Sequence, residues 1–396
     1  MQKLRYLTAG ESHGQGLVGT IEGLPAGLSI MEDEIFAELQ RRQKGHGRGG
    51  RMKIETDRAR ILTGVRHGKT LGGPVALFIE NSDWKNWQTK MAVEDVEEAV
   101  KSVVIPRPGH ADYAGALKYR HEDIRNVLER ASARETATRV ALGAICRKML
   151  RELAIDIVSH VTQIGAAKNP FSVARLGSKD DLGFALSDIN QLADASTVRC
   201  LDSTVAEQMI SEIDAAKDAR DTVGGTFEVV ALNLPVGLGS HVHWDRKLDT
   251  QIAAAMMSIQ AMKGVEIGLG FQAAGIRGSE VHDPFYFDEK SGQYYRSRNH
   301  AGGLEGGITN GMPLVVRVAM KPISTLMKPL DSVDMLTKEK TAAHIERSDY
   351  CAVPAASVVG EAMLALVLAD AVLDKFGGDS MSEILERHAE WVKSAR

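Results

Sequence analysis

The chain has 396 residues, of which 44% are hydrophobic and 25% are charged, and it contains no low-complexity tract. This composition is typical of a globular protein with a large core, and it excludes an intrinsically disordered chain. The formal net charge of −4 gives no overall attraction to nucleic acid or to an anionic membrane, so a bound anion must be held by a local cluster of cations.

Cysteine spacing and apolar segments bear on the compartment. Cys146, Cys200 and Cys351 are far apart and form no CxxC pair, which argues against a disulfide framework and against a zinc site. No basic segment followed by an apolar one opens the chain, and the longest apolar stretch, residues 355–376, is interrupted by acidic side chains. We therefore expect a cytoplasmic protein without a membrane span.

Short runs of branched apolar residues predict strands, and apolar positions that recur every three or four residues predict helices. The predicted strands span residues 3–8, 17–22, 61–65, 74–80, 226–232, 265–269 and 314–320. The predicted helices span residues 33–43, 134–154, 205–217, 245–263, 355–376 and 380–393. Because the two kinds of element do not alternate one for one, the pattern favours an α+β layer arrangement over a doubly wound parallel sheet.

The chain shows no sign of division into parts. It has no linker rich in proline, serine or glycine and no internal repeat, so we expect residues 1–396 to form a single large domain. Polar stretches at residues 177–188 and 283–300 are typical of surface loops. The two common nucleotide-binding fingerprints, GxGxxG after a strand and GxxxxGK[ST], are absent, so phosphate chemistry must use another device.

Two histidines lie in predicted loops that are rich in glycine or proline. His13 lies between glycines in GESHG, directly after the first predicted strand, and His110 follows prolines and a glycine in IPRPGHADY. An imidazole changes its charge near neutral pH, so both are candidates for acid–base catalysis. The alternative for each is an ordinary hydrogen-bonded loop histidine. The HVH triplet at residues 241–243 lacks further ligands at recognisable spacing, and we predict no metal site.

A basic segment, RRQKGHGRGGRMK at residues 41–53, contains six cations and no acid. The guanidinium groups of Arg42, Arg48 and Arg51 are suited to paired hydrogen bonds with phosphate or carboxylate, and the glycines let the backbone close around such a ligand. We therefore expect a polyanionic small molecule here, and cations that are poorly neutralised without it. A solvated basic loop and an RNA-binding arginine–glycine segment are the alternatives.

Three further segments carry groups that suit an anion or a cofactor. Ser132, in ERASARET, precedes a long amphipathic helix and could either bind a ligand or simply cap that helix. Lys321, in AMKPIST, ends a predicted strand beside two hydroxyl groups. Arg347 and Asp349, in RSDYCAVPAA, precede the longest apolar helix, where they could line a site or form a buried ion pair.

Together these segments resemble one family. GESHGQGLVGTIEGLPAG, RRQKGHGRGGRM, RPGHADY, ERASARETATRVALGAI, SIQAMKGVEIG, AGGLEGGITNG, MKPIST and RSDYCAVPAA occur in the order seen in chorismate synthases, from Leu4 to about Leu373. The resemblance implies an α+β sandwich with central helices between mixed or antiparallel sheets, usually assembled as a tetramer. It also implies a lyase of the shikimate pathway of aromatic amino acid biosynthesis. Such a lyase makes chorismate by anti 1,4-elimination of phosphate from 5-enolpyruvylshikimate 3-phosphate, with reduced FMN and no net redox change. Some members also reduce their flavin with NADPH.

The resemblance further implies roles for individual residues. His13 would be the acid at the leaving phosphate, and His110 would protonate or polarise the reduced flavin. Asp349, with Ser132, would serve the N5 side of the flavin. The implied anion-binding arginines are Arg42, Arg48, Arg51 and Arg347. The implied flavin contacts are Arg130, Ala131, Ser132, Gln260, Ala261, Gly306, Lys321, Pro322, Ile323, Ser324, Thr325 and Arg347.

Two functions from other classes compete with this interpretation. A nucleic-acid-binding protein would use the basic segment, but the net charge of −4 and an aromatic content of only 5% count against it. A flavin oxidoreductase would take hydride from a nicotinamide, and the missing dinucleotide fingerprint counts only weakly against that. We expect a small-molecule substrate and no nucleic-acid or membrane partner.

Overall fold

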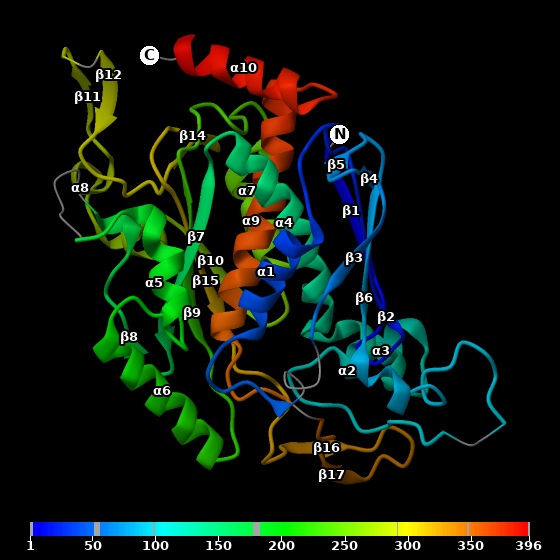
Figure 1. Ribbon diagram of the computed structural model, residues 1–396. Coiled ribbons are helices and arrows are strands. Elements are labelled where there is room, and N and C mark those ends of the chain that lie inside the picture. The colour runs from blue at the N-terminus through cyan, green and yellow to red at the C-terminus, as the bar shows by residue number, and fades with distance from the viewer. Residues whose placement is uncertain are drawn as a thin grey trace.

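The computed structural model describes residues 3–50, 56–97, 100–176, 183–290, 292–346 and 348–394. Figure 1 shows a layered molecule in which central helices lie between two sheets. Both sheets are antiparallel throughout. The predicted α+β class with helices between sheets is therefore confirmed.

The first sheet has four strands in the order β1–β2–β6–β3. They are β1 (Arg5–Ala9), β2 (Gly16–Glu22), β6 (Val75–Glu80) and β3 (Ala59–Thr63). Side chains alternate between the faces, so Leu17 and Ile21 are fully buried while Val18 between them is partly exposed. One face thus packs on the helices, and the other lies at the surface.

The second sheet has five strands in the order β10–β15–β9–β7–β8. They are β10 (Met262–Ile267), β15 (Leu314–Met320), β9 (Gly225–Leu232), β7 (Asp156–Ile164) and β8 (Ala167–Lys168). The middle strands are buried on both faces, because the helices cover one face and a smaller cluster around Val158, Val230 and Ile189 covers the other.

The central layer contains α1 (Glu32–Gln43), α4 (Thr136–Glu152), α7 (Leu248–Met257) and α9 (Val353–Phe376). Helix α9 is long and apolar enough to cross a membrane, but it is mostly buried inside the protein and forms the core helix. It runs against α4 so closely that a Cβ on Gly143 would lie 2.5 Å from the Cβ of Ala362. This close packing brings the N-terminal ends of α4 and α9 to the same end of the layer.

The remaining elements lie around this sandwich. The helices are α2 (Asp112–Tyr119), α3 (Arg125–Ala131), α5 (Ile189–Ala195), α6 (Ser203–Asp218), α8 (Gly278–Val281) and α10 (Met381–Ser394). The hairpins pair β4 (Val65–Arg66) with β5 (Lys69–Thr70), β11 (Phe285–Asp288) with β12 (Gln293–Arg296), β13 (Leu304–Glu305) with β14 (Ile308–Thr309), and β16 (Asp331–Val333) with β17 (Lys340–Ala342).

A buried ion network ties the central helices together. The carboxylate of Glu361 on α9 accepts hydrogen bonds from Arg41 of α1 at 2.7 Å, from Arg147 of α4 at 2.5 Å and from Arg199 at 3.2 Å. Glu38 accepts from both Arg41 and Arg147. Arg41, which belongs to the basic segment, is therefore part of the buried ion network between the central helices.

Each predicted strand overlaps an observed one, but two predictions need correction and the long strand β7 was missed. The helix predicted over residues 245–263 ends at Met257, and the chain turns at Ala261, whose φ is 70°, into β10. Strand β7 was not predicted, because the polar residues Ser159 and His160 interrupt its apolar pattern even though both side chains are buried. The expected loop at 283–300 contains the β11–β12 hairpin. Residues 177–182 of the other expected loop lie outside the described residues.

Candidate active site

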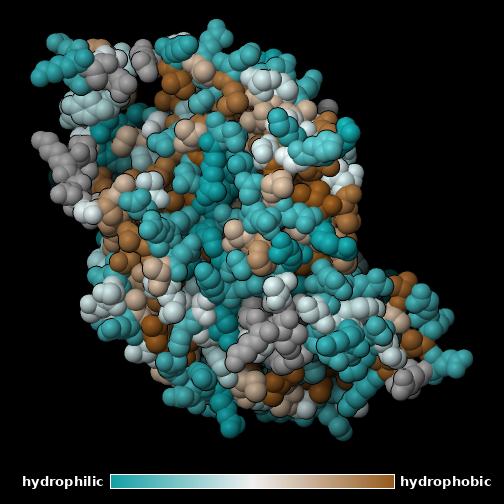
Figure 2. All heavy atoms as spheres, in the orientation of Figure 1, coloured by the Kyte–Doolittle hydropathy of each residue, from teal (hydrophilic) through white to brown (hydrophobic). Residues whose placement is uncertain are grey.

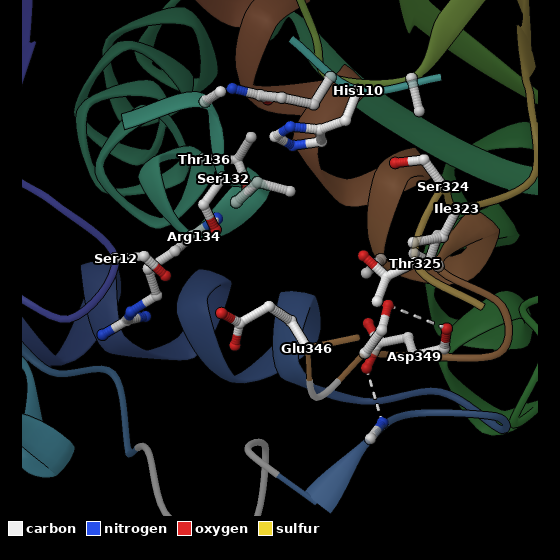
Figure 3. Close-up of a pocket in the computed structure, with 18 of the residues that line it drawn as sticks. Ser12, His110, Ser132, Arg134, Thr136, Ile323, Ser324, Thr325, Glu346 and Asp349 are labelled. Atoms are coloured by element: carbon white, nitrogen blue, oxygen red, sulfur yellow. Dashed lines mark hydrogen bonds between the residues drawn. The ribbon is translucent and has the colours of Figure 1, made fainter. Parts of the chain in front are cut away.

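A cavity of about 390 Å³ lies where loops from both sheets meet the N-terminal ends of α4 and α9. Its wall is built from the loop after β1, the segment after α1, the loop before α2, the turn before β10 and the segment after β15. Figure 3 shows His110 on one side of this cavity and Glu346 and Asp349 on the other. Helix N-termini carry partial positive charge and unpaired amide groups, so this position suits an anionic ligand.

The cavity brings together most of the residues that the sequence singled out. Those that line it are His13, Arg42, Arg48, His110, Ala131, Ser132, Gln260, Ala261, Lys321, Ile323, Ser324, Thr325 and Asp349. Pro322 stands between lining residues, and Arg130 donates to the carbonyl oxygen of Thr8 at 2.7 Å. Gly306, between β13 and β14, precedes the start of β15, whereas the cavity lies at the end of that strand. Arg51 and Arg347 lie outside the described residues.

His13 is held by a buried carboxylate on α3. Its Nδ1 lies 3.0 Å from both carboxylate oxygens of Glu129, and its backbone N–H donates to Glu129 Oε2 at 2.8 Å. Arg125 donates to the same carboxylate at 2.9 Å. Burial alone would raise the pKa of Glu129, but the contacts with His13 and Arg125 outweigh it and hold that pKa below its ordinary value. The ionised carboxylate therefore fixes the imidazole ring.

His110 is held in a similar way from the first residue of α2. Its Nδ1 lies 2.5 Å from Asp112 Oδ1, and Arg107 Nε donates to the other oxygen of Asp112 at 2.8 Å. Arg107 also donates to Thr325 Oγ1 at 3.1 Å, which links this loop to the segment after β15. Burial would raise the pKa of Asp112, but the hydrogen bonds from His110 and Arg107 lower it well below its ordinary value.

The described arginines of the basic segment are paired with acids that lie outside the segment. Arg42 is 5% exposed and lies 3.4 Å from Asp57 Oδ2, while Arg48 pairs with Asp349 at 2.8 Å. Burial lowers the pKa of Arg42 to about 10, although Asp57 opposes the shift. The expectation of poorly neutralised cations is thus wrong for Arg41, Arg42 and Arg48. The sequence segment holds no acid, but the fold brings carboxylates to it.

Comparison with known proteins agrees with this geometry. A family model described as chorismate synthase matches residues 4–373. The chain belongs to the chorismate synthase family.

Relatives and a solved structure match over almost the whole chain. Chorismate synthase of Aquifex aeolicus (strain VF5) is 56% identical over 401 residues, which cover 100% of this chain and 99% of that protein. Chorismate synthase of Bacillus subtilis (strain 168) is 54% identical over 398 residues, covering 99% and 100%. A structure titled "Crystal Structure of Chorismate Synthase" matches with a TM-score of 0.78 and 47% identity, covering 99% of this chain and 98% of that one. The chain is accordingly an enzyme of the lyase class.

Three of the remaining chorismate synthase motif residues also have defined contacts. The Ser132 hydroxyl accepts from the backbone N–H of Arg134 at 3.3 Å, so Ser132 both caps the turn before α4 and lines the cavity. Asp349, besides pairing with Arg48, accepts from the N–H of Gly49 at 2.6 Å. Lys321 donates to the carbonyl oxygen of Gly109 at 3.0 Å, and burial, with the charge of Lys263, lowers the pKa of Lys321.

Several polar residues of the site were not singled out from the sequence. Arg107, Arg134 and Glu346 line the cavity, and Glu129 and Asp112 support its histidines. Burial would raise the pKa of Glu346, but the His344 hydrogen bond and the Arg125 charge lower it to about 2. The only sequence signal for Asp112 and Arg134 was their place inside the motifs HADY and ERASARET. Nothing in the sequence pointed to Glu346 as a site residue.

Proposed function

We propose that this enzyme converts 5-enolpyruvylshikimate 3-phosphate to chorismate and phosphate by anti 1,4-elimination, with reduced FMN and no net redox change. The observation that carries the proposal is the pair of carboxylate-held histidines, His13 with Glu129 and His110 with Asp112, in one cavity. The elimination breaks one C–O bond and one C–H bond of the substrate, so groups that hold or move protons are needed at two places.

The cations of the cavity suit the charge of the substrate, which carries a phosphate and two carboxylates. Arg42, Arg48, Arg107 and Arg134 all line the wall, together with the N-terminal end of α4. Fixed positive groups stabilise negative charge that builds up on a leaving phosphate, more strongly in a partly enclosed site than in water. We assign His13 as the acid at this phosphate. Because Nδ1 is engaged by Glu129, the proton comes from Nε2.

The wall beside Gln260 fits a flavin. In the described part of the chain, Gln260 Oε1 is buried without a hydrogen-bond partner, while its Nε2 donates to Glu135 at 2.7 Å. An orphaned buried acceptor calls for an N–H donor, and a reduced flavin ring has several. Apolar Ile259, Met320 and Val359 line the same cavity and suit a flat ring system.

When bound, reduced FMN supplies transient electron density for the departure of the allylic phosphate. The residues that would hold it are Arg130, Ala131, Ser132, Gln260 and Ala261, with Lys321 to Thr325 for its polar chain, and Arg347 and Gly306 as further proposed contacts. His110 would hold or give a proton at the N1 side of the ring, and Asp349 with Ser132 would serve its N5 side. Arg42, Arg48 and Arg51 would hold the anionic groups of the substrate, or of NADPH if it reduces the flavin.

The setting of the enzyme is also part of the proposal. We infer a cytoplasmic homotetramer without a nucleic-acid or membrane partner, acting in aromatic amino acid biosynthesis. Cys146, Cys200 and Cys351 are unpaired and buried, which suits a reducing compartment. The neutralisation of Arg42 and Arg48 by carboxylates counts against an RNA-binding use of the basic segment.

An anaerobic assay tests this function. The purified protein is mixed with dithionite-reduced FMN and 5-enolpyruvylshikimate 3-phosphate, and chorismate absorbance and released phosphate are followed together, with oxidised FMN as the control. We expect chorismate and phosphate to appear in equal amounts with reduced FMN, and neither product to appear with oxidised FMN. Tight binding of flavin and substrate without product would contradict the proposal. Steady NAD(P)H consumption with an acceptor would favour an oxidoreductase, and salt-sensitive RNA binding without flavin binding would favour a nucleic-acid binder.

A further inference from the structure

An indole ring covers His13. The ring of Trp87 stacks on the imidazole, with centroids 3.9 Å apart and planes 24° apart. Trp87 follows the short 3-10 helix Ser82–Asn86 and belongs to none of the motifs that mark the family. It is not among the residues that line the cavity, so it packs behind His13 rather than beside a ligand.

The indole itself is anchored. The indole Nε1 donates to the buried carboxylate of Asp83 at 3.2 Å. The backbone N–H of Trp87 donates to the carbonyl oxygen of Trp84 at 2.8 Å. The guanidinium carbon of Arg125 lies 5.0 Å from the Trp87 ring centroid, and Lys90 Nζ lies 5.1 Å from it. Arg125 also binds Glu129, so the carboxylate and the indole that hold His13 share a cation.

These contacts restrict His13 from two directions. Glu129 fixes the ring within its plane through Nδ1, and Trp87 blocks rotation out of that plane and keeps water from one face. The two contacts together restrict the direction in which the other ring nitrogen, Nε2, can point.

We propose that Trp87 is a positioning residue for catalysis, which holds the imidazole of His13 with Nε2 directed toward the leaving phosphate. The inference rests on the proposed role of His13. In the step concerned, the C–O bond breaks with its electron pair remaining on the phosphate oxygen, and the Nε2 proton of His13 passes to the phosphate. The imidazole becomes neutral and regains a proton from solvent before the next turnover.

The contact is tested first, without cofactor or substrate. The emission of Trp87 is obtained as the difference between wild type and Trp87→Phe. A protonated imidazole in contact with indole quenches its fluorescence, so at mildly acidic pH His13→Asn is expected to raise this difference emission. The same subtraction for Trp84→Phe is the matched control, because Trp84 lies in the same turn and has no ring contact with His13 among the described residues. Equal emission with and without His13 would overturn the stacked arrangement.

Turnover is tested with a double-mutant cycle. Trp87→Leu is expected to lower kcat about 10-fold, with the KM for 5-enolpyruvylshikimate 3-phosphate changed less than about 3-fold, and Trp87→Phe is expected to restore most of kcat. In a His13→Asn background Trp87→Leu should have no further effect, because Trp87 acts through His13. Trp84→Leu should leave kcat unchanged.

The possible outcomes separate the two proposals. A wild-type protein that makes no chorismate would defeat the proposed function itself. An active wild type whose kcat is unchanged in Trp87→Leu, or an equal loss with and without His13, would overturn the inference about Trp87. If Trp87→Leu fails to fold, Trp87→Phe and Trp87→Tyr are compared in the same cycle, and a kcat loss that persists in the His13→Asn background would overturn it.

Discussion

At the scale of single residues, the site pairs each working histidine with a buried acid. Glu129 and Asp112 each contact Nδ1, from different helices, and each also binds an arginine, Arg125 or Arg107. In both cases the arginine offsets the charge of the carboxylate, so the carboxylate stays ionised when buried. The arrangement fixes which nitrogen of each ring is used.

Replacing the acid should therefore impair the histidine. We predict that Asp112→Asn lowers kcat about 10- to 100-fold, while His110→Ala lowers it by about 100-fold or more, with FMN binding retained. The amide keeps the size of the side chain but not the charge that holds His110 and Arg107. The measurement is the anaerobic chorismate assay at saturating substrate. Asp245→Asn is the control, because the exposed pair His243–Asp245 has a similar 2.7 Å contact. Full activity of Asp112→Asn would show that the pair is only structural.

Arg48 tests the cationic wall. Arg48→Ala should raise the KM for the substrate about 10-fold or more, since a hydrogen bond to a charged group contributes about 1.5–3 kcal/mol. It also removes the ion-pair partner of Asp349, so an uncompensated negative charge then faces the anionic substrate. Steady-state kinetics at several salt concentrations measure the effect, with the exposed Arg5→Ala as the control. A collapse of the melting temperature with unchanged KM would instead make Arg48 structural.

The sequence located the reactive groups of the site better than their supports. His13, His110, Ser132 and Asp349 could be predicted because they lie in glycine-rich or family-specific segments that reach the cavity. Trp87 could not, because it contacts His13 from a segment more than 70 residues away and only the tertiary fold brings the rings together.

At the scale of elements, the buried network around Glu361 decides how the central helices pack. It joins α1, α4 and α9 and includes Arg199 from the loop before α6. Burial would raise the pKa of Glu361, but its arginines lower it well below the ordinary 4.5. A carboxylate with a lowered pKa stabilises the fold above its unfolded-state pKa. That contribution is lost only as the pH falls below about 4.5 toward the folded-state pKa.

We predict that Glu361→Gln destabilises the protein by about 3–5 kcal/mol at neutral pH, because it leaves buried arginines without their shared counter-ion. Denaturant and thermal unfolding measure the change. Glu152→Gln is the matched control, since Glu152 forms an exposed pair with Lys148 on α4 and should contribute little. If both variants unfold alike, the network does not hold the helices together.

The elements themselves were predictable where burial follows a regular period. Strands β2 and β6 alternate between buried and more exposed residues, and α9 is mostly apolar and mostly buried, so the patterns of these elements match their surroundings. The missed strand β7 carries Ser159 and His160 inside the protein, where the Ser159 hydroxyl donates to Glu361 and His160 Nε2 lies 3.3 Å from Glu228 Oε1. The helix that ended early at Met257 gives way to the turn at Ala261, which lines the cavity. Local periodicity cannot reveal partners supplied by distant segments.

At the scale of the whole molecule, the two sheets and the helices between them share one large hydrophobic cluster. Leu17 and Leu77 of the first sheet and Phe227 and Val316 of the second belong to the same cluster. This continuity supports our proposal that residues 1–396 fold as a single domain. It also explains why one cavity can take residues from both halves of the chain, since the sandwich holds the two sets of loops at a fixed separation.

The outer face of the first sheet bears on assembly. Leu7 on β1 is 76% exposed, Leu62 on β3 is 57% exposed, and Val18 on β2 is partly exposed. Figure 2 shows hydrophobic side chains on the side of the molecule that this sheet forms. Apolar side chains gathered on one sheet face often mark a contact with another subunit.

We predict that light scattering will give four times the monomer mass of 42.9 kDa. Leu7→Glu should lower that mass, because a carboxylate would be buried in the contact, and should leave the cavity geometry unchanged. Lys217→Glu, at an exposed position of α6 away from this sheet, is the control for added negative charge. A monomeric wild type would contradict the proposed tetramer. A tetrameric Leu7→Glu would show that the subunits meet through another surface, such as the exposed aromatic side chains of the β11–β12 hairpin.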